Sequence, residues 1–206
     1  MAAQDSPQIY LVTPPAFELE TFVPRLAAVL DAVDIACLRL ALAGRDEDAI
    51  ARAADACRMV AHERDVAIVI ADHLHLVESH GLDGVHLMDA ARTVRTARKD
   101  LGADAIVGSW CGASKHAGMS AAEAGADYVC FGPLGQSALF NGAVAEREMF
   151  AWWSEVIEVP VVAEGALTLE LVADFAPVTD FFAFGDEIWT SPDPVAALKA
   201  MVAAMA

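Results

Sequence analysis

Positive charge is scarce in this sequence. Lysine and arginine number 13 together against 30 aspartate and glutamate residues, which gives a formal net charge of -17. A diffuse acidic surface repels nucleic acids and anionic membranes, so we expect neither as a partner. An anionic small molecule would have to be held by local donors, such as backbone N–H groups, a metal ion or a few well-placed cations.

Long apolar runs and paired cysteines are also missing. No stretch reaches the roughly 18 apolar residues of a membrane helix, and residues 1–7 lack the basic and then apolar character of a secretory leader. The four cysteines, Cys37, Cys57, Cys111 and Cys130, form no Cys-x-x-Cys pair, so we expect reduced thiols. These features predict a cytoplasmic protein.

Several nucleotide-binding and hydrolase motifs are absent. The sequence has no Gly-x-Gly-x-x-Gly, no P-loop, no His-Glu-x-x-His and no Gly-x-Ser-x-Gly. What the chain has instead is apolar residues, 56% of the total, in short runs that alternate with amphipathic stretches. Eight of these runs are continuously apolar, as buried parallel strands are. They cover residues 8–13, 34–40, 66–71, 84–87, 105–110, 128–131, 159–163 and 180–184.

Helical patterns fill the gaps between the predicted strands. They cover residues 17–33, 46–63, 73–80, 89–101, 114–125, 146–156 and 167–175, and a last one follows at 192–205. A strand-and-helix unit of roughly 25 residues that repeats in this way predicts an α/β fold, a (β/α)₈ TIM barrel. No linker or change of composition divides the chain, so we expect one domain over residues 1–206. An open doubly wound sheet is the alternative.

The ligand site of such a barrel lies at the C-terminal ends of the strands. Arg39 ends the second predicted strand, where a charge is costly unless it meets an anion. It is a candidate to clamp a phosphate, or else part of a structural salt bridge. Asp72 follows the third strand and is a candidate ligand for Mg²⁺, or else a helix cap.

The fourth and fifth strands lead to further candidates. His86 shares a strand face with Gly84 and is either a residue that orients a ligand or a core histidine. Asp89 is a second candidate metal carboxylate or a helix cap. Lys115 supplies possible positive charge, and the small residues around it would let a ligand approach the backbone. Cys111 lacks an assignable base, so a small pocket-lining residue is favoured over a nucleophile.

Glycines follow the last three strands. Gly132 begins a loop that runs to about residue 145 and is interpreted as a lid over the site, or else a connector. Gly165 and Gly185 would let backbone N–H groups reach phosphate oxygens, because the loops after strands seven and eight form the usual phosphate site of these barrels. Asp186, which follows Gly185, is grouped with these phosphate-binding candidates.

The order of several segments resembles one enzyme family. QIYLVTP, CLRLAL, GLDGVHLMD, GADYVCFGP and VPVVAEGALT occur in the order found in thiamin phosphate synthase and its thiazole tautomerase relative. GLDGVHL and GADYVCFGP are the most specific pieces, and the match covers nearly the whole chain. The resemblance implies a (β/α)₈ barrel that transfers a hydroxymethylpyrimidine group from its diphosphate onto thiazole phosphate. It also implies Mg²⁺, which stabilises the departing diphosphate.

Compared residue by residue, the chain resembles a divergent member of this family. Arg39 stands at the family's diphosphate-binding arginine, but Cys37 and Ala41 replace the glutamine and lysine that flank it. Asp72 matches the first Mg²⁺ aspartate, and Ala71 replaces the asparagine before it.

Further departures follow along the chain. Ala91 occupies the position of the family's second Mg²⁺ aspartate, and Asp89 lies close to it in the sequence. Residues 137–140 read Ser-Ala-Leu-Phe where the family has a lysine, and residues 164–166 read Glu-Gly-Ala where it has a glycine pair. The residues that bind thiazole phosphate in the family are therefore better matched here than the residues that bind the diphosphate. The tautomerase relative has a catalytic histidine after the fifth strand. The only match here is His116, which lies several residues later in the sequence than that position.

Three functional hypotheses stay open at this point. The first is a thiamin phosphate synthase, with Arg39, Asp72 and His86 as its catalytic residues. The second is a barrel that binds a phosphorylated small molecule without diphosphate chemistry. The third is a tautomerase-like role without a metal. All three imply phosphorylated small molecules as partners, and a homodimer is one arrangement that the sequence allows.

Overall fold

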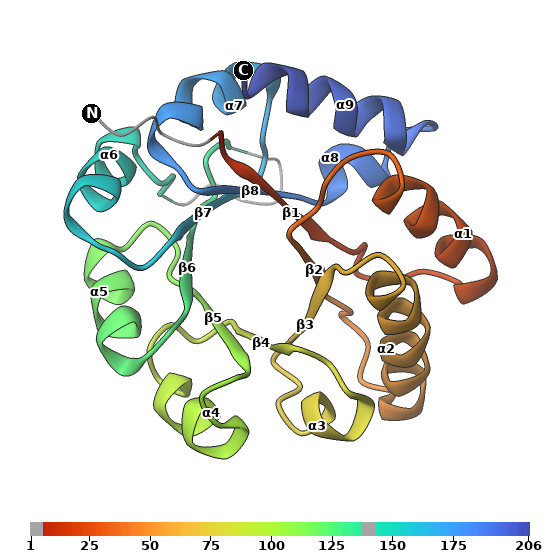
Figure 1. Cartoon of the computed structure of the whole chain (residues 1–206). Helices are drawn as coiled ribbons and strands as arrows, with labels where there is room; N and C mark the ends of the chain where they lie inside the picture. Colours follow the sequence, from red (N-terminus) through yellow and green to blue (C-terminus); the bar gives the residue numbers. More distant parts are fainter. Residues whose placement is uncertain (1–5, 137–142) are drawn as a thin grey trace.

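Eight parallel strands form a closed barrel in chain order. The computed structural model describes residues 6–136 and 143–206. The barrel closes because β1 pairs with β8 on one side and with β2 on the other. Figure 1 looks along the barrel and shows the helices in a ring around the strands. The prediction of a (β/α)₈ barrel is confirmed, and the open sheet is excluded.

Each predicted strand is present at its predicted place. The strands are β1 (Gln8–Val12), β2 (Cys37–Leu40), β3 (Ala67–Ala71), β4 (Gly84–Leu87), β5 (Ile106–Trp110), β6 (Tyr128–Phe131), β7 (Val161–Glu164) and β8 (Phe181–Phe184). The helices are α1 (Leu19–Leu30), α2 (Glu47–His62), α3 (Leu76–His80), α4 (Val94–Leu101), α5 (Lys115–Ala124), α6 (Arg147–Val156), α7 (Leu169–Phe175), α8 (Asp186–Trp189) and α9 (Pro194–Ala204). Helix α8 was not predicted, because four residues are too few to show a helical period.

Polar side chains and glycines define the helix ends. The side chains of Asp46, Ser114 and Asp193 each accept a backbone N–H in the first turn of the helix that follows. Gly81 and Gly125 end their helices in the left-handed region, with φ of 61° and 101°. A residue with a Cβ atom is disfavoured there, so these glycines fix where the chain turns back into the next strand.

Side chains of each strand alternate between two layers. The larger apolar core lies between the outside of the barrel and the helices. A smaller cluster fills the inside of the barrel and includes Tyr10, Cys37, Tyr128 and Cys130. Polar side chains therefore share the barrel interior with apolar ones, and this interior leads to the site. No helix in the described ranges is long and apolar enough to cross a membrane.

Candidate active site

A cavity of about 850 Å³ opens at the C-terminal ends of the strands. Arg39 of β2 and Gly165 after β7 both line it, so the predicted placement of these two residues at one rim is confirmed. Trp110 at the end of β5 supplies an aromatic wall. Three acidic side chains also line it, namely Glu164 of β7 with Asp186 and Glu187 of α8, and most of the other lining residues are apolar or small.

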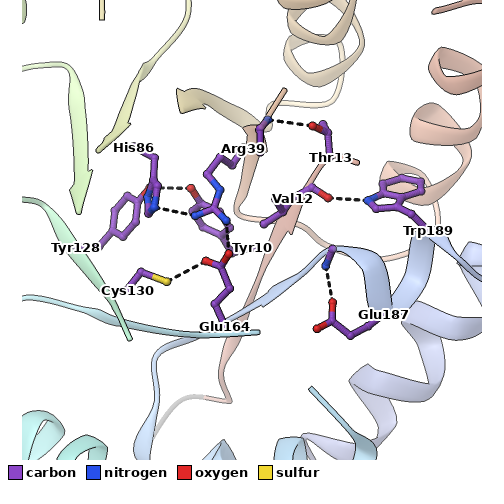
Figure 2. Close-up of polar contacts among 12 residues, drawn as sticks. Tyr10, Val12, Thr13, Arg39, His86, Tyr128, Cys130, Glu164, Glu187 and Trp189 are labelled. Atoms are coloured by element: carbon purple, nitrogen blue, oxygen red, sulfur yellow. Dashed lines mark hydrogen bonds and ion pairs between the residues drawn. The ribbon is translucent and has the colours of Figure 1, made fainter. Parts of the chain in front are cut away.

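Arg39 lies at the centre of a polar network, where it is 4% exposed. Its Nη2 forms an ion pair with Oε1 of Glu164, and its Nη1 donates to Nε2 of His86 at 2.8 Å. Figure 2 shows the guanidinium between these two partners. Burial lowers the pKa of Arg39, but the charge and hydrogen bond of Glu164, together with Tyr10 and Cys130, outweigh this effect and the pKa is raised. The arginine is therefore a buried, permanent cation.

The hydrogen bonds continue from His86 to two tyrosines. Because a guanidinium can only donate, Nε2 of His86 must accept. Burial, and then the charge of Arg39, holds the pKa of His86 well below its ordinary value, so the ring is neutral and its proton is on Nδ1. That proton is donated to the Tyr128 hydroxyl at 2.9 Å, and the Tyr128 and Tyr10 hydroxyls are 2.7 Å apart. This network fixes the tautomer of His86.

Glu164 also contacts Cys130. The Cys130 thiol donates to Oε2 of Glu164 at 3.0 Å, so both carboxylate oxygens of Glu164 have partners. Burial, and then the negative charge of Glu164, raises the pKa of Cys130 well above its ordinary value. Cys130 is therefore a thiol that orients the carboxylate and is no nucleophile at neutral pH.

Asp72 and Asp89 follow the adjacent strands β3 and β4. Asp72 has a φ of 59°, and its Oδ1 accepts the backbone N–H of Met88 at 2.9 Å. This bond holds its carboxylate beside the residue that precedes Asp89. Oδ1 of Asp89 accepts from the Thr93 hydroxyl at 2.9 Å. In the described ranges the second oxygen of each carboxylate accepts no hydrogen bond, so the pair offers hard oxygen donors of the kind that Mg²⁺ prefers.

Neither aspartate caps the helix that follows it. Helix α3 has His75 as its N-cap, and helix α4 has Thr93. No group of three or more His, Cys, Asp or Glu side chains within residues 6–136 and 143–206 is arranged to hold a metal ion. Mg²⁺ is commonly held by one or two carboxylates together with substrate phosphates and water. Asp72 and Asp89 supply carboxylates of that number and kind, although neither lines the cavity that contains Arg39.

Six of the predicted site residues do not line the cavity. They are Asp72, Asp89 and His86, described above, and Cys111, Lys115 and Gly132. Cys111 is buried in the outer core, and burial raises its pKa to about 11. The Nζ of Lys115 lies 3.0 Å from the ring centroid of Trp152, so its charge is directed to the helix layer. A Cβ atom on Gly132 would lie 2.1 Å from the carbonyl oxygen of Glu164, so Gly132 allows β6 and β7 to pack closely.

Gly108 lies within β5 and leaves space beside the backbone, but this space does not serve a ligand. In the structure the ring of Tyr128 takes that space, because a Cβ on Gly108 would lie 1.9 Å from Cζ of Tyr128. The interpretation of the loop after Gly132 as a lid falls partly on residues 137–142, which lie outside the described ranges, as do residues 137–140 of the family comparison.

The network contains residues that sequence reasoning did not select. Tyr10, Tyr128 and Cys130 read as ordinary members of apolar strands, and Glu164 was noted only as a departure from the family pattern. One signal was present. Glu164 is a charged residue at the end of an apolar strand, like Arg39, and both argue for a partner in the barrel mouth.

A closed (β/α)₈ barrel with a cavity at the C-terminal ends of its strands, lined by Arg39 and Glu164, has the architecture of the TIM-barrel class of enzymes. A family model described as thiamine monophosphate synthase matches residues 9–180. The chain therefore belongs to the thiamine monophosphate synthase family, as the resemblance predicted.

Similar proteins agree with this assignment. The chain is 42% identical to the thiamine-phosphate synthase of Rhodospirillum centenum, over 93% of this chain and 94% of that protein. It is 36% identical to the thiamine-phosphate synthase of Hyphomonas neptunium, over 96% and 94%. Thiamine phosphate pyrophosphorylase from Pyrococcus furiosus has the same fold, with a TM-score of 0.82 at 18% identity over 96% of this chain and 95% of that one.

Proposed function

We propose that this chain is a thiamin phosphate synthase. It joins the hydroxymethylpyrimidine group of a pyrimidine diphosphate to thiazole phosphate and releases diphosphate. The observation that carries the proposal is the buried cation Arg39 in the wall of a cavity at the strand ends. Its support is family membership and the 42% identity to a protein of that name over 93% of this chain.

The reaction requires a site that stabilises a leaving group. The bond from the pyrimidine methylene carbon to the diphosphate oxygen breaks, and a bond from that carbon to the thiazole nitrogen forms. Negative charge collects on the departing diphosphate, so fixed positive charge accelerates this step more than proton transfer does. Arg39 supplies such a charge, and His86 and Glu164 hold its guanidinium in place. Trp110 offers a flat apolar face against which a substrate ring can pack.

Mg²⁺ is the proposed cofactor. Asp72 and Asp89 would hold it, because their carboxylates follow adjacent strands and each keeps one oxygen without a hydrogen-bond partner in the described ranges. When bound, the ion would supply charge that neutralises the diphosphate. The acidic chain makes this contribution important, since Arg39 is the one basic residue among those that line the described cavity.

Location and partners follow from the same proposal. The partners are phosphorylated small molecules, and a homodimer stays a prediction. The four cysteines are free thiols, and all four are buried. Free thiols fit the reducing cytoplasm, which is the proposed location.

A turnover assay with both substrates tests the proposal. Loss of one preorganised charge in such a site costs on the order of 10²–10³ in rate. We therefore expect Arg39→Ala and Asp72→Asn each to reduce kcat/KM by that factor, and chelation of Mg²⁺ to stop turnover.

A matched control accompanies these variants. Cys111→Ser should change the rate little, because Cys111 lies in the outer core and is protonated at neutral pH. Brisk turnover in Arg39→Ala would show that the diphosphate site lies elsewhere. A wild-type protein that binds thiazole phosphate but forms no product would replace the synthase with a binding protein.

A further inference from the structure

An internal carboxylate lies where a phosphate is expected in this barrel. Oε2 of Glu187 accepts the backbone N–H of Gly185 at 2.9 Å, and Oε1 accepts the backbone N–H of Leu167 at 3.1 Å. Gly185 follows β8, and Leu167 lies in the loop after β7. One carboxylate therefore joins the two loops whose N–H groups commonly bind phosphate in these barrels.

The position of Glu187 is held by a separate contact. Two residues along the chain, the indole N–H of Trp189 donates to the carbonyl oxygen of Val12 at 2.6 Å, and this bond is buried. Figure 2 shows Trp189 against β1 and Glu187 beside the end of β8. Helix α8 is thereby fixed to the barrel, and Glu187 lies half-buried at the edge of the cavity.

The surrounding charges do not favour an incoming anion. Asp186 and Glu164 line the same cavity, and Arg39 already forms an ion pair with Glu164. A phosphate that approaches Gly185 and Leu167 must therefore displace one carboxylate in the presence of two others. Each backbone N–H can serve one strong acceptor at a time, so Glu187 and the phosphate compete for the same donors.

We propose that Glu187 is a specificity-determining residue of the acceptor site. Its carboxylate competes with the phosphate of the thiazole substrate for the N–H groups of Leu167 and Gly185, and so reduces the preference for a phosphorylated thiazole over the free thiazole alcohol. The inference rests on the proposed function for the identity of the acceptor. It deepens that function, because it names the residue that sets how strongly the acceptor's phosphate is bound.

Binding measurements test the competition directly. Titration calorimetry with inorganic phosphate, thiazole phosphate and thiazole alcohol is carried out on the wild type and on Glu187→Ala. The variant should bind both phosphate ligands at least about tenfold more tightly, which corresponds to about 1.4 kcal/mol. Affinity for the neutral alcohol should stay the same. A purely structural role for Glu187 would lower stability and would not strengthen phosphate binding.

Three further variants separate two effects on phosphate affinity, namely occupancy of the N–H groups by Glu187 and negative charge alone. Glu187→Gln keeps one acceptor oxygen and the length of the side chain, and should give an intermediate gain if Glu187→Ala does not fold. Asp186→Asn removes the same charge from an exposed position in the same cavity, and should gain much less, because a solvated charge acts only through screened repulsion. Glu155→Gln, on the exposed surface of α6, controls for net charge.

Each result has a definite meaning. Phosphate affinity that is unchanged or weaker in both Glu187 variants would overturn the inference, as would an equal gain in Asp186→Asn. Phosphate binding is measured without turnover, so these outcomes are independent of the synthase assay. A wild type that makes thiamin phosphate while its Glu187 variants bind phosphate no more tightly would leave the function and remove the inference.

Discussion

The buried charges of the barrel mouth are arranged as a pair, with neutral groups around them. Arg39 is 4% exposed and Glu164 is 20% exposed. A guanidinium this deeply buried requires a counter-charge, since an uncompensated buried charge costs about 3–5 kcal/mol. Nε of Arg39 has no hydrogen-bond partner in the described ranges, which adds a further cost. Such a costly arrangement is expected where function requires the charge.

His86 makes the stability of the protein depend on pH. Its pKa is lowered in the folded state, while the unfolded chain has the ordinary value of about 6.5. Below that pH the unfolded state binds a proton that the folded state does not, so the free energy of unfolding falls as pH falls. One such group contributes a slope of up to about 1.4 kcal/mol per pH unit.

The measurement is urea unfolding between pH 7.5 and about 5. The non-titrating variant His86→Gln should lose stability at pH 7.5 but show a smaller decrease on acidification than the wild type. His116→Gln, at an exposed position of α5, should keep the wild-type slope. Equal slopes for the wild type and His86→Gln would mean that His86 is protonated in the folded barrel.

At the scale of elements, the interior network depends on how closely two neighbouring strands pack. Gly108 of β5 pairs with Tyr128 of β6, and the Tyr128 ring lies over the glycine. A methyl group there would lie 1.9 Å from Cζ and 2.2 Å from the hydroxyl oxygen of Tyr128. The ring is enclosed by the barrel, so it cannot move aside without breaking its bonds to His86 and Tyr10.

Gly108→Ala should therefore destabilise the protein by about 1–3 kcal/mol or more, the usual cost of overpacking a core. Chemical denaturation measures the effect. Gly44→Ala is the matched control, because nothing lies within 4 Å of a Cβ at Gly44, and it should change stability by less than about 0.5 kcal/mol. If Gly108→Ala were as stable as the control, the Tyr128 ring would not lie over β5 as described.

At the scale of the whole molecule, the excess of acidic side chains dominates. A net charge of -17 on 206 residues produces self-repulsion in the compact state. Salt shortens the distance over which these charges act, from about 30 Å at 0.01 M to about 8 Å at 0.15 M. Salt therefore reduces charge repulsion more in the folded state than in the unfolded state, because the charges of the folded state are closer together.

Added salt should therefore raise the Tm. Between about 0.01 and 0.15 M NaCl we expect an increase of at least about 2 °C, which for a chain of this size corresponds to roughly 0.5–1 kcal/mol. KCl at equal ionic strength should act alike, because screening does not depend on the identity of the ion. A Tm that stays constant or falls would show that the acidic surface does not limit stability.

Local patterns in the sequence determined the elements and the end of the barrel that carries the site. The eight strands were predictable because each is a short apolar run. The caps Asp46, Ser114 and Asp193 are local features too, because each bonds to residues within one turn. Arg39 stood out because a charge in an apolar strand requires a partner. The predicted bounds of α3 and α4 were less exact than those of the strands, since the first residues of the predicted ranges have weak helical periodicity.

Only the tertiary structure decided which residues meet. Arg39 and Glu164 are 125 residues apart in the sequence, and Tyr10 and Tyr128 are 118 apart. Their contacts depend on strand register and on closure of β1 against β8, which join distant segments that no local pattern connects. The same is true of Glu187, which binds the N–H of Leu167 across two loops. The sequence marked some of the site residues, such as Arg39, but only the closed barrel showed which side chains face one another, because side chains of different strands meet only inside it.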